Sequence, residues 1–284
     1  MMMGRTLFLA IGFLSGTLLS AQAAWGKALH GDALHKDARQ GAALSIAVAS
    51  NFRPVAQRLA DDFTRRTGHR VTLSSASSGV LYNQVFYGAS YDLFFSADRE
   101  RPRMLQEAGK VKGEPKTYAY GRLVFWQPGN PTPDYKVLSQ WQGNLAMADP
   151  GKAPYGFAAQ QVLEYFDLWG KPRIELVQGM SVQQAWQFIA TGNVRAGFVA
   201  LSQVVGGKID SGYLLLRDEL YNPIRQNVVI IKTSKNTKLA QQFLDFIFAE
   251  PQQKIIQEAG YYPGVINTGS RIAGKRAELS KDNK

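Results

Sequence analysis

The sequence predicts an α/β protein made of two lobes. Three observations predict this fold class. First, a unit of short apolar strand, loop of small residues and amphipathic helix recurs four times between residues 44 and 192. Second, segments such as 91–97, 196–201 and 227–232 are nearly continuous apolar runs, which is typical of strands covered on both faces. Third, the body between residues 42 and 266 is long enough for two lobes of ordinary domain size.

The four units follow one another in two pairs. In the first unit, Val55, Leu59 and Phe63 fall four residues apart and mark the buried face of a helix. Because strands alternate with helices, we expect sheets rich in parallel strand pairs. In each unit a strand, a loop and a helix follow one another. We expect them at 44–49, 50–51 and 52–63 in the first unit and at 70–75, 76–79 and 80–86 in the second. In the third unit we expect them at 145–149, 150–156 and 157–166, and in the fourth at 174–179, 180–181 and 182–192.

Two longer strand-like segments, 117–127 and 224–232, bracket the middle of the chain. We interpret them as crossovers between the lobes. The first lobe is then discontinuous and comprises 42–121 and 226–266, and the second lobe comprises 122–225. A pair of helices over 239–261, broken at Pro251, is expected to close the first lobe.

The two ends of the chain carry different signals. Residues 1–23 combine an early arginine, an apolar run from Leu7 to Leu19 and a small-x-small site, which is the layout of a secretory signal peptide. The run is shorter than the roughly 20 apolar residues of a membrane-spanning helix. We therefore expect export to the periplasm with cleavage near Ala23. The segments 24–41 and 267–284 have no clear periodicity and are expected to be flexible.

Composition excludes several classes of protein. The chain has no cysteine, which rules out disulfides, thiolate metal sites and a cysteine nucleophile. The net charge is +11, but part of it lies in the two end segments, and the exported address argues against a nucleic-acid partner. A hydrolase would need a base beside its nucleophile, and His30 and His35 lie in the N-terminal segment, away from the serine-rich loops. We expect no enzyme activity, no catalytic residue and no bound metal ion.

Each recurring unit ends at a helix N-terminus, where main-chain N–H groups lack partners and the helix dipole is positive. Ligands bind at such junctions in open α/β sheets, at the carboxyl ends of the strands. Hydroxyl, amide and main-chain N–H donors without a charged side chain predict reversible binding of a tetrahedral oxyanion. The alternative is that Ser50, Ser78 and Ser181 simply cap helices. The candidate residues are Ser50, Asn51, Ser78, Tyr155 and Val182, with Ser77 and Ser181 as further candidates.

Several motifs resemble, in the same order, those of the periplasmic molybdate-binding proteins of ABC importers. They are AVASNF, SSASSG followed by VLYNQ, GASYDLFFSAD, ADPGKAPYG, and GFVAL followed by AEPQQKIIQEAGY, and they extend from Leu44 to Pro263. The resemblance implies a type II periplasmic binding protein, with two α/β lobes, two crossover strands and a ligand cleft between the lobes. It further implies a monomer without a cofactor, which binds molybdate or tungstate and delivers it to an inner-membrane permease with a cytoplasmic ATPase.

The same resemblance implies roles for particular residues. Ser50 and Ser78 would bind the anion through hydroxyl and main-chain N–H groups, and Tyr155 and Val182 through their N–H groups. Many members of the family have a ligand tyrosine at the position that is Ala200 here. A subgroup without that tyrosine uses an asparagine next to the first serine or threonine, and Asn51 fits this variant. Another tetrahedral oxyanion, such as sulfate or chromate, remains the alternative ligand.

Overall fold

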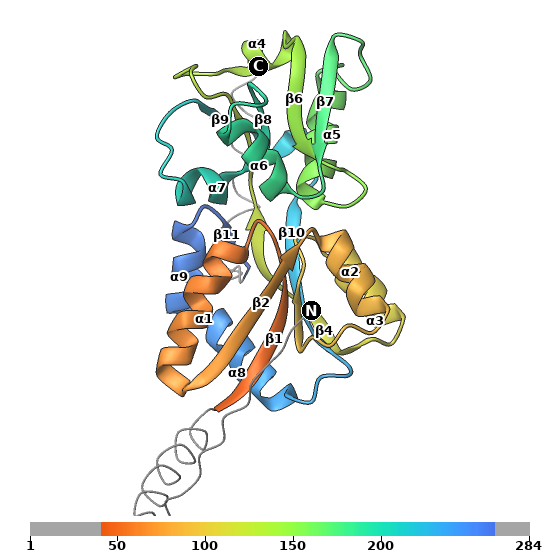
Figure 1. Ribbon diagram of the computed structural model, residues 1–284, viewed down its shortest axis with the longest axis vertical. Coiled ribbons are helices and arrows are strands. Elements are labelled where there is room, and N and C mark those ends of the chain that lie inside the picture. The colour runs from red at the N-terminus through yellow and green to blue at the C-terminus, as the bar shows by residue number, and fades with distance from the viewer. Residues whose placement is uncertain (1–40, 265–284) are drawn as a thin grey trace, which may run out of the picture. The chain divides into compact units, whose positions relative to one another are not determined.

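The computed structural model describes residues 41–264. Within this part of the chain the strands form two mixed sheets, each covered by helices (Figure 1). The predicted signal peptide, the N-terminal segment up to residue 40 and the C-terminal tail lie outside the described residues. No helix within 41–264 combines the length and apolar character that crossing a bilayer requires.

The first sheet has six strands in the order β11-β4-β10-β3-β1-β2. Strand β1 pairs in parallel with β2 and β3, whereas β10 runs antiparallel to β3 and β4. The strands are β1 (Gly41–Ala49), β2 (His69–Ala76), β3 (Leu93–Phe95), β4 (Val111–Gly121), β10 (Ile224–Ile231) and β11 (Tyr262–Pro263).

Helices cover both faces of the first sheet because its strands alternate between two cores. Ile46 and Phe95 face a core formed with α1, α8 and α9, whereas Ala47 and Phe94 face a second core formed with α2 and α3. In Figure 1 the two groups of helices lie on opposite sides of the strands. The helices are α1 (Arg53–Thr67), α2 (Ser78–Phe86), α3 (Glu100–Glu107), α8 (Thr237–Phe248) and α9 (Glu250–Glu258).

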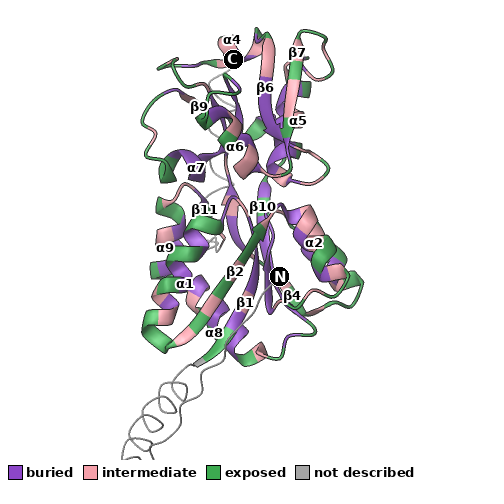
Figure 2. Cartoon of the chain, viewed as in Figure 1, coloured by how far each residue is buried: buried purple, intermediate pink, exposed green. Residues whose placement is uncertain are grey.

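The second sheet has five strands in the order β7-β6-β8-β5-β9 and is also covered on both faces. Buried residues concentrate on the central strands β6, β8 and β5, whereas the edge strands β7 and β9 are mostly of intermediate or high exposure (Figure 2). The strands are β5 (Leu123–Trp126), β6 (Gly143–Ala148), β7 (Ile174–Gly179), β8 (Gly197–Ala200) and β9 (Tyr213–Leu215). The helices are α4 (Tyr135–Ser139), α5 (Pro154–Tyr165), α6 (Val182–Ala190), α7 (Leu201–Gly206) and a 3-10 turn at Asp218–Leu220.

The chain passes between the sheets at two neighbouring points. Strand β4 ends in the first sheet at Gly121, and β5 begins in the second sheet at Leu123. The return is made before β10, whose first residue, Ile224, pairs with Gly121. The expected crossover 117–127 is therefore two strands that belong to different sheets, separated at Arg122.

The closing helices differ from the prediction in the position of their break. They are separated at Ala249, whose backbone is extended, and Pro251 lies inside the first turn of α9. A proline is accommodated there because the first N–H groups of a helix have no partner within the helix. The proline signal therefore marks the start of the second helix rather than the break itself.

Candidate anion-binding site

The four loop-to-helix junctions meet at one small cavity. Its volume is about 10 Å³, far below the roughly 300–1,000 Å³ typical of pockets for organic ligands, so its walls lie close together. Both lobes contribute to its wall, since the residues before α1 and α2 face those at the starts of α5 and α6. The lining residues are Ala49, Ser50, Asn51, Ser77, Ser78, Ala97, Ala153, Pro154, Tyr155 and Val182. Of the candidate residues, only Ser181 is not among them.

The first junction follows β1. The Ser50 N–H donates to the carbonyl oxygen of Ala76 at 2.9 Å and so ties the ends of β1 and β2 together. Only the hydroxyl of Ser50 is then available to a ligand, which differs from the expectation that its N–H would also bind. The main-chain N–H of Asn51 has no acceptor among residues 41–264. Helix α1 begins without a side-chain cap.

The second junction contains a buried hydroxyl without a partner. Ser77 precedes α2 in an extended conformation, but its side chain makes no capping hydrogen bond. It is 4% exposed, and its Oγ has no hydrogen-bond partner within the described part of the chain. Buried polar atoms in folded proteins are nearly always hydrogen-bonded, so a buried hydroxyl without a protein partner in a cavity wall is a candidate donor to a ligand or water.

The hydroxyl of Ser78 already accepts a hydrogen bond from the main chain. Its Oγ accepts the Ala97 N–H at 2.8 Å, and the residue is buried. A hydroxyl has a single proton, and here that proton remains free to be donated. Neither Ser77 nor Ser78 uses its side chain to cap α2, so plain helix capping does not account for this pair.

The junctions of the second lobe contribute main-chain donors. Tyr155 and Val182 lie in the first turns of α5 and α6, and their N–H groups have no acceptor among residues 41–264. Ser181 behaves differently, because its side chain accepts the Gln184 N–H at 3.3 Å. Ser181 therefore fits the capping interpretation, which Ser77 and Ser78 do not.

The cavity wall carries no charged side chain. Its one titratable group is the phenol of Tyr155, and burial raises the pKa of this group well above its usual range, so that it stays neutral. Two cations near the junctions are paired: Arg101 with Asp98, and Lys152 with Asp149 at 2.7 Å. The hydrogen bond from Lys152 is the main cause that lowers the pKa of Asp149. The site consequently offers neutral donors, with positive helix ends behind them.

A buried polar network lies behind the cavity and was not found from the sequence. Gln226, on β10, accepts hydrogen bonds from the Asn51 amide and the Tyr118 hydroxyl, each at 2.9 Å, and donates to the Tyr155 hydroxyl at 3.4 Å. Tyr261 accepts from the Asn51 amide at 3.2 Å and donates to the Asn51 carbonyl at 2.8 Å. Both amide hydrogens of Asn51 are thus directed into the protein, which leaves its main-chain N–H for a ligand.

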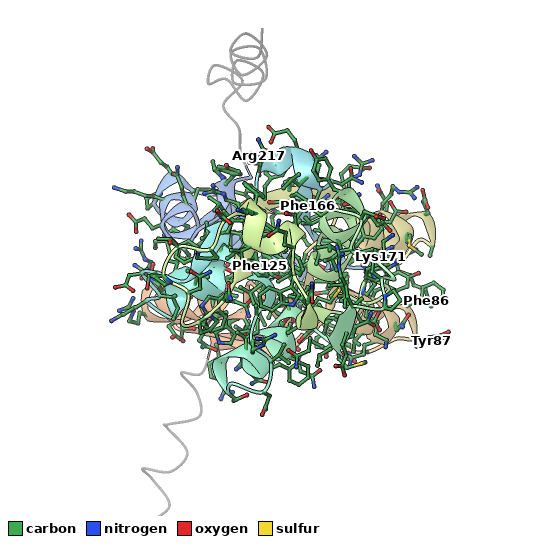
Figure 3. All side chains as sticks on the ribbon, turned by 90° about the horizontal axis from the view of Figure 1, so that it is seen from above. Phe86, Tyr87, Phe125, Phe166, Lys171 and Arg217 are labelled. Atoms are coloured by element: carbon green, nitrogen blue, oxygen red, sulfur yellow. The ribbon has the colours of Figure 1, made fainter. Side chains whose placement is uncertain are left out.

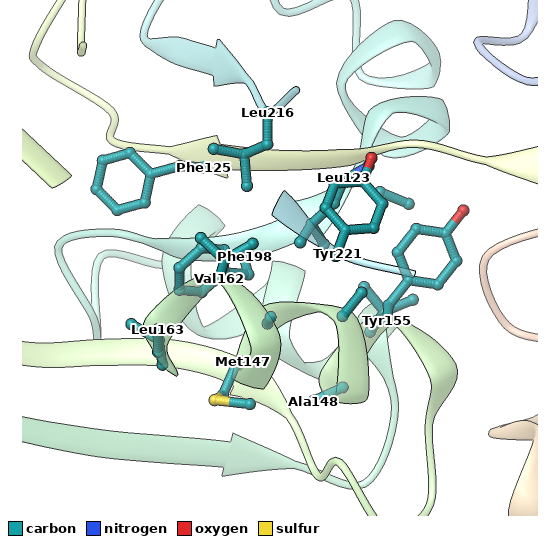
Figure 4. Packing of buried hydrophobic residues seen from close by; sticks show 14 of the residues in the cluster. Leu123, Phe125, Met147, Ala148, Tyr155, Val162, Leu163, Phe198, Leu216 and Tyr221 are labelled. Atoms are coloured by element: carbon teal, nitrogen blue, oxygen red, sulfur yellow. The ribbon is translucent and has the colours of Figure 1, made fainter. Parts of the chain in front are cut away.

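The ring of Tyr155 lies at the margin of the core of the second lobe, with its hydroxyl directed out of that cluster (Figure 4). Its hydroxyl reaches the crossover. A β-carbon added at Gly121 would lie 2.3 Å from it, which no side chain tolerates. Gly121 therefore allows the side chain of Tyr155 to pack against the point where the chain changes lobes.

Ala200 is buried and lies outside the cavity wall. Its N–H donates to Oε1 of Gln203 at 2.9 Å, and its methyl side chain offers no hydrogen-bond donor. No group of three or more potential metal-ligating side chains occurs in residues 41–264. His69, the histidine of the described part, begins β2, whereas Ser77 follows the other end of that strand.

Two α/β lobes, two crossover segments and a donor-lined cavity between helix starts define a solute-binding protein of the periplasmic type. The comparisons with known proteins agree. The family described as bacterial extracellular solute-binding protein matches residues 44–262, and the chain belongs to this family. The predicted fold class, that of a periplasmic binding protein, is confirmed.

Relatives within the family carry a more specific name. The molybdate-binding protein ModA of Rhodobacter capsulatus is 40% identical over 218 residues, which cover 76% of this chain and 86% of the relative. ModA of Azotobacter vinelandii is 40% identical over 230 residues, covering 79% and 91%. The solved structure of the periplasmic molybdate-binding protein of A. vinelandii matches with a TM-score of 0.72 and 38% identity, over 77% of this chain and 98% of that one.

Proposed function

We propose that this protein captures molybdate in the periplasm and delivers it to an ABC importer. The observation that carries the proposal is the cavity itself, in which unpartnered neutral donors from four helix starts converge from both lobes. The identity of about 40% to two molybdate-binding proteins supports molybdate as the particular ligand.

The proposed ligand contacts follow from which donors are free. The hydroxyls of Ser50, Ser77 and Ser78 would donate to the anion, together with the main-chain N–H groups of Asn51, Ser78, Tyr155 and Val182. A tetrahedral dianion has four oxygen atoms that only accept, so it can satisfy this all-donor set. The positive ends of the helices offset its charge without a counter-ion in the cavity.

The donor set also supports a selectivity. No carboxylate lines the cavity, so a protonated anion such as hydrogen phosphate would bring a proton for which the wall has no strong acceptor. Molybdate and tungstate present the same four acceptors, and we propose that both bind. Sulfate has the same charge but is smaller, and we propose that a closed site whose size fits the larger anion discriminates against sulfate.

Binding is reversible and involves no covalent step. We propose that the lobes close around the anion by a hinge motion at the two crossovers, and that the closed monomer docks on a membrane permease that is driven by a cytoplasmic ATPase. The export signal in residues 1–23 supports delivery of the protein to the periplasm.

The test is a calorimetric titration of the mature, anion-stripped protein with molybdate, tungstate, sulfate and phosphate in parallel. We expect tight binding of the first two and little binding of the others. A preference for sulfate or chromate would assign the protein to the uptake of another oxyanion. Absence of binding to all of these anions would overturn the proposal.

A further inference from the structure

The two lobes meet at a second place, directly beside the cavity. The turn at 151–152, in the second lobe, presents two carbonyl groups to the first lobe. The Gly79 N–H donates to the Lys152 carbonyl at 2.9 Å, and Nη2 of Arg101 donates to the Gly151 carbonyl at 3.0 Å. A β-carbon at Gly79 would lie 2.9 Å from the Lys152 oxygen and 3.1 Å from Nη2 of Arg101. The surfaces therefore approach so closely that only a glycine fits at this position.

Arg101 is held in place before it reaches across. Its guanidinium hydrogen-bonds to the carboxylate of Asp98, which also accepts the Arg101 N–H at 2.9 Å and the Ser96 hydroxyl at 3.1 Å. The side chains of Arg101 and Asp98 are only 19% and 16% exposed. A planar guanidinium fixed by one partner loses little further freedom when it binds another, so the contact to Gly151 forms at a small entropic cost.

The position of this contact links it to the cavity. Gly79 directly follows Ser77 and Ser78 in the cavity wall, and the 151–152 turn leads into Tyr155. The contact can form only when the walls contributed by the two lobes are together. On the basis of the proposed function, we propose that Arg101, oriented by Asp98, is an interlobe clasp that determines how long the bound anion is retained.

The charge balance of the clasp predicts which rate constant it controls. Arg101 and Asp98 form an ion pair without net charge, so the clasp adds little to the long-range attraction of an anion. Its hydrogen bonds to the 151–152 turn exist only after closure. Arg101 is thus a positioning residue whose loss acts mainly on the dissociation rate, and the one positive charge removed with it should affect association no more than removal of the charge of Arg103 does.

The first experiment is stopped-flow binding of molybdate to Arg101→Gln. We expect dissociation to be about tenfold faster, since a hydrogen bond to a charged donor is lost, with the association rate no lower than in the control variant below. Arg101→Lys keeps the charge and should restore part of the effect. The matched control is Arg103→Gln, which removes an equal charge from the same helix, because Arg103 pairs only with Glu100 and Glu107 of α3 among the described residues. An unchanged dissociation rate in Arg101→Gln, or equal changes in both glutamine variants, would overturn the clasp.

A second measurement does not depend on affinity. Because the chain has no cysteine, spin labels can be placed through Tyr87→Cys and Tyr165→Cys, which are 84% and 64% exposed on different lobes. Tyr87 projects from the margin of the molecule in Figure 3. Interlobe distances are recorded with and without molybdate. A short distance between the labels marks the protein with its lobes together, and a long distance marks the protein with its lobes apart. Wherever the labelled protein with Arg101 shows the short distance, Arg101→Gln should shift the population towards the long distance.

The two measurements separate the clasp from the proposed function. If the labelled protein without further substitution never shows the short distance, or if Arg101→Gln leaves its population unchanged, the clasp is wrong. Failure of molybdate to bind would refute the proposed ligand alone, and the distances recorded without anion would still decide on the clasp. If molybdate binds normally and Arg101→Gln changes neither the dissociation rate nor the interlobe distances, only the clasp is refuted.

Discussion

Replacement of Ser77 by alanine tests whether its hydroxyl donates a hydrogen bond to the anion or only caps α2. Ser77 is the first residue before α2, a position where serine usually accepts a main-chain hydrogen bond. Here the hydroxyl makes no such bond, is buried and lines the cavity. The substitution therefore removes a group that contributes nothing to the unliganded protein but is available to the anion.

The expected magnitudes follow from this geometry. A hydrogen bond to a charged acceptor contributes about 1.5–3 kcal/mol, so Ser77→Ala should weaken molybdate binding about 10- to 150-fold. The free energy of unfolding without anion should stay constant or rise by about 1 kcal/mol, because a buried hydroxyl without a partner is unfavourable. The affinity for molybdate is thus expected to fall without any loss of stability.

The assay is calorimetric titration combined with urea unfolding of the anion-free protein, and the chain provides two controls. Ser181→Ala removes a true cap outside the cavity, so it should cost about 0.5–2 kcal/mol of stability and leave affinity unchanged. Ser78→Ala should affect both quantities, because it leaves the buried Ala97 N–H without its acceptor. If Ser77→Ala bound molybdate as tightly as the wild type, or lost stability as Ser181→Ala does, Ser77 would not be a donor to the anion.

Three further predictions concern the region behind the cavity. Gly121→Ala should weaken molybdate binding about tenfold in a titration, because the added methyl group would displace the side chain of Tyr155 and with it the main-chain N–H of that residue. Gln226→Leu should lower the free energy of unfolding in urea by about 2–5 kcal/mol, since the Asn51 amide and the Tyr118 hydroxyl lose a buried acceptor. Burial raises the folded-state pKa of four buried tyrosines above the ordinary value of 10.0. Their contribution to stability is therefore complete below about pH 10 and is lost as the pH rises further, with a slope of about 1.4 kcal/mol per pH unit for each tyrosine ionised in the unfolded chain. Thermal unfolding between about pH 8 and 12 measures this loss, and a melting temperature independent of pH would contradict it. The four are Tyr118, Tyr155, Tyr221 and Tyr261.

The sequence was informative wherever a short-range pattern carried the information. The period of Val55, Leu59 and Phe63 predicted a buried helix face, and the three residues are buried in α1. The apolar run 91–97 predicted a strand covered on both faces, and β3 lies between two cores. The recurring order of strand, small-residue loop and helix indicated that ligand-facing residues would sit at helix starts, and six of the seven candidate residues line one cavity.

The sequence was less informative about which donors are free. Ser50, Ser77 and Ser181 occupy similar places before helices, and nothing local distinguishes them. The structure shows that the N–H of Ser50 is bound to Ala76, that the hydroxyl of Ser77 has no partner among residues 41–264, and that the side chain of Ser181 caps α6. Availability depends on the neighbours of each group in space.

By itself, the sequence determined the α/β class, the order of the four recurring strand-and-helix units and the candidate residues, because apolar periodicity and helix-start chemistry act over a few residues. Tertiary structure decided what those residues can do. The side-chain amide of Asn51 is bound by Gln226 and Tyr261, which are 175 and 210 residues distant along the chain, and Arg101 reaches Gly151 across the lobes. Hydrogen bonds of this kind exist only when packing brings distant groups within about 3 Å, and no local pattern specifies that distance.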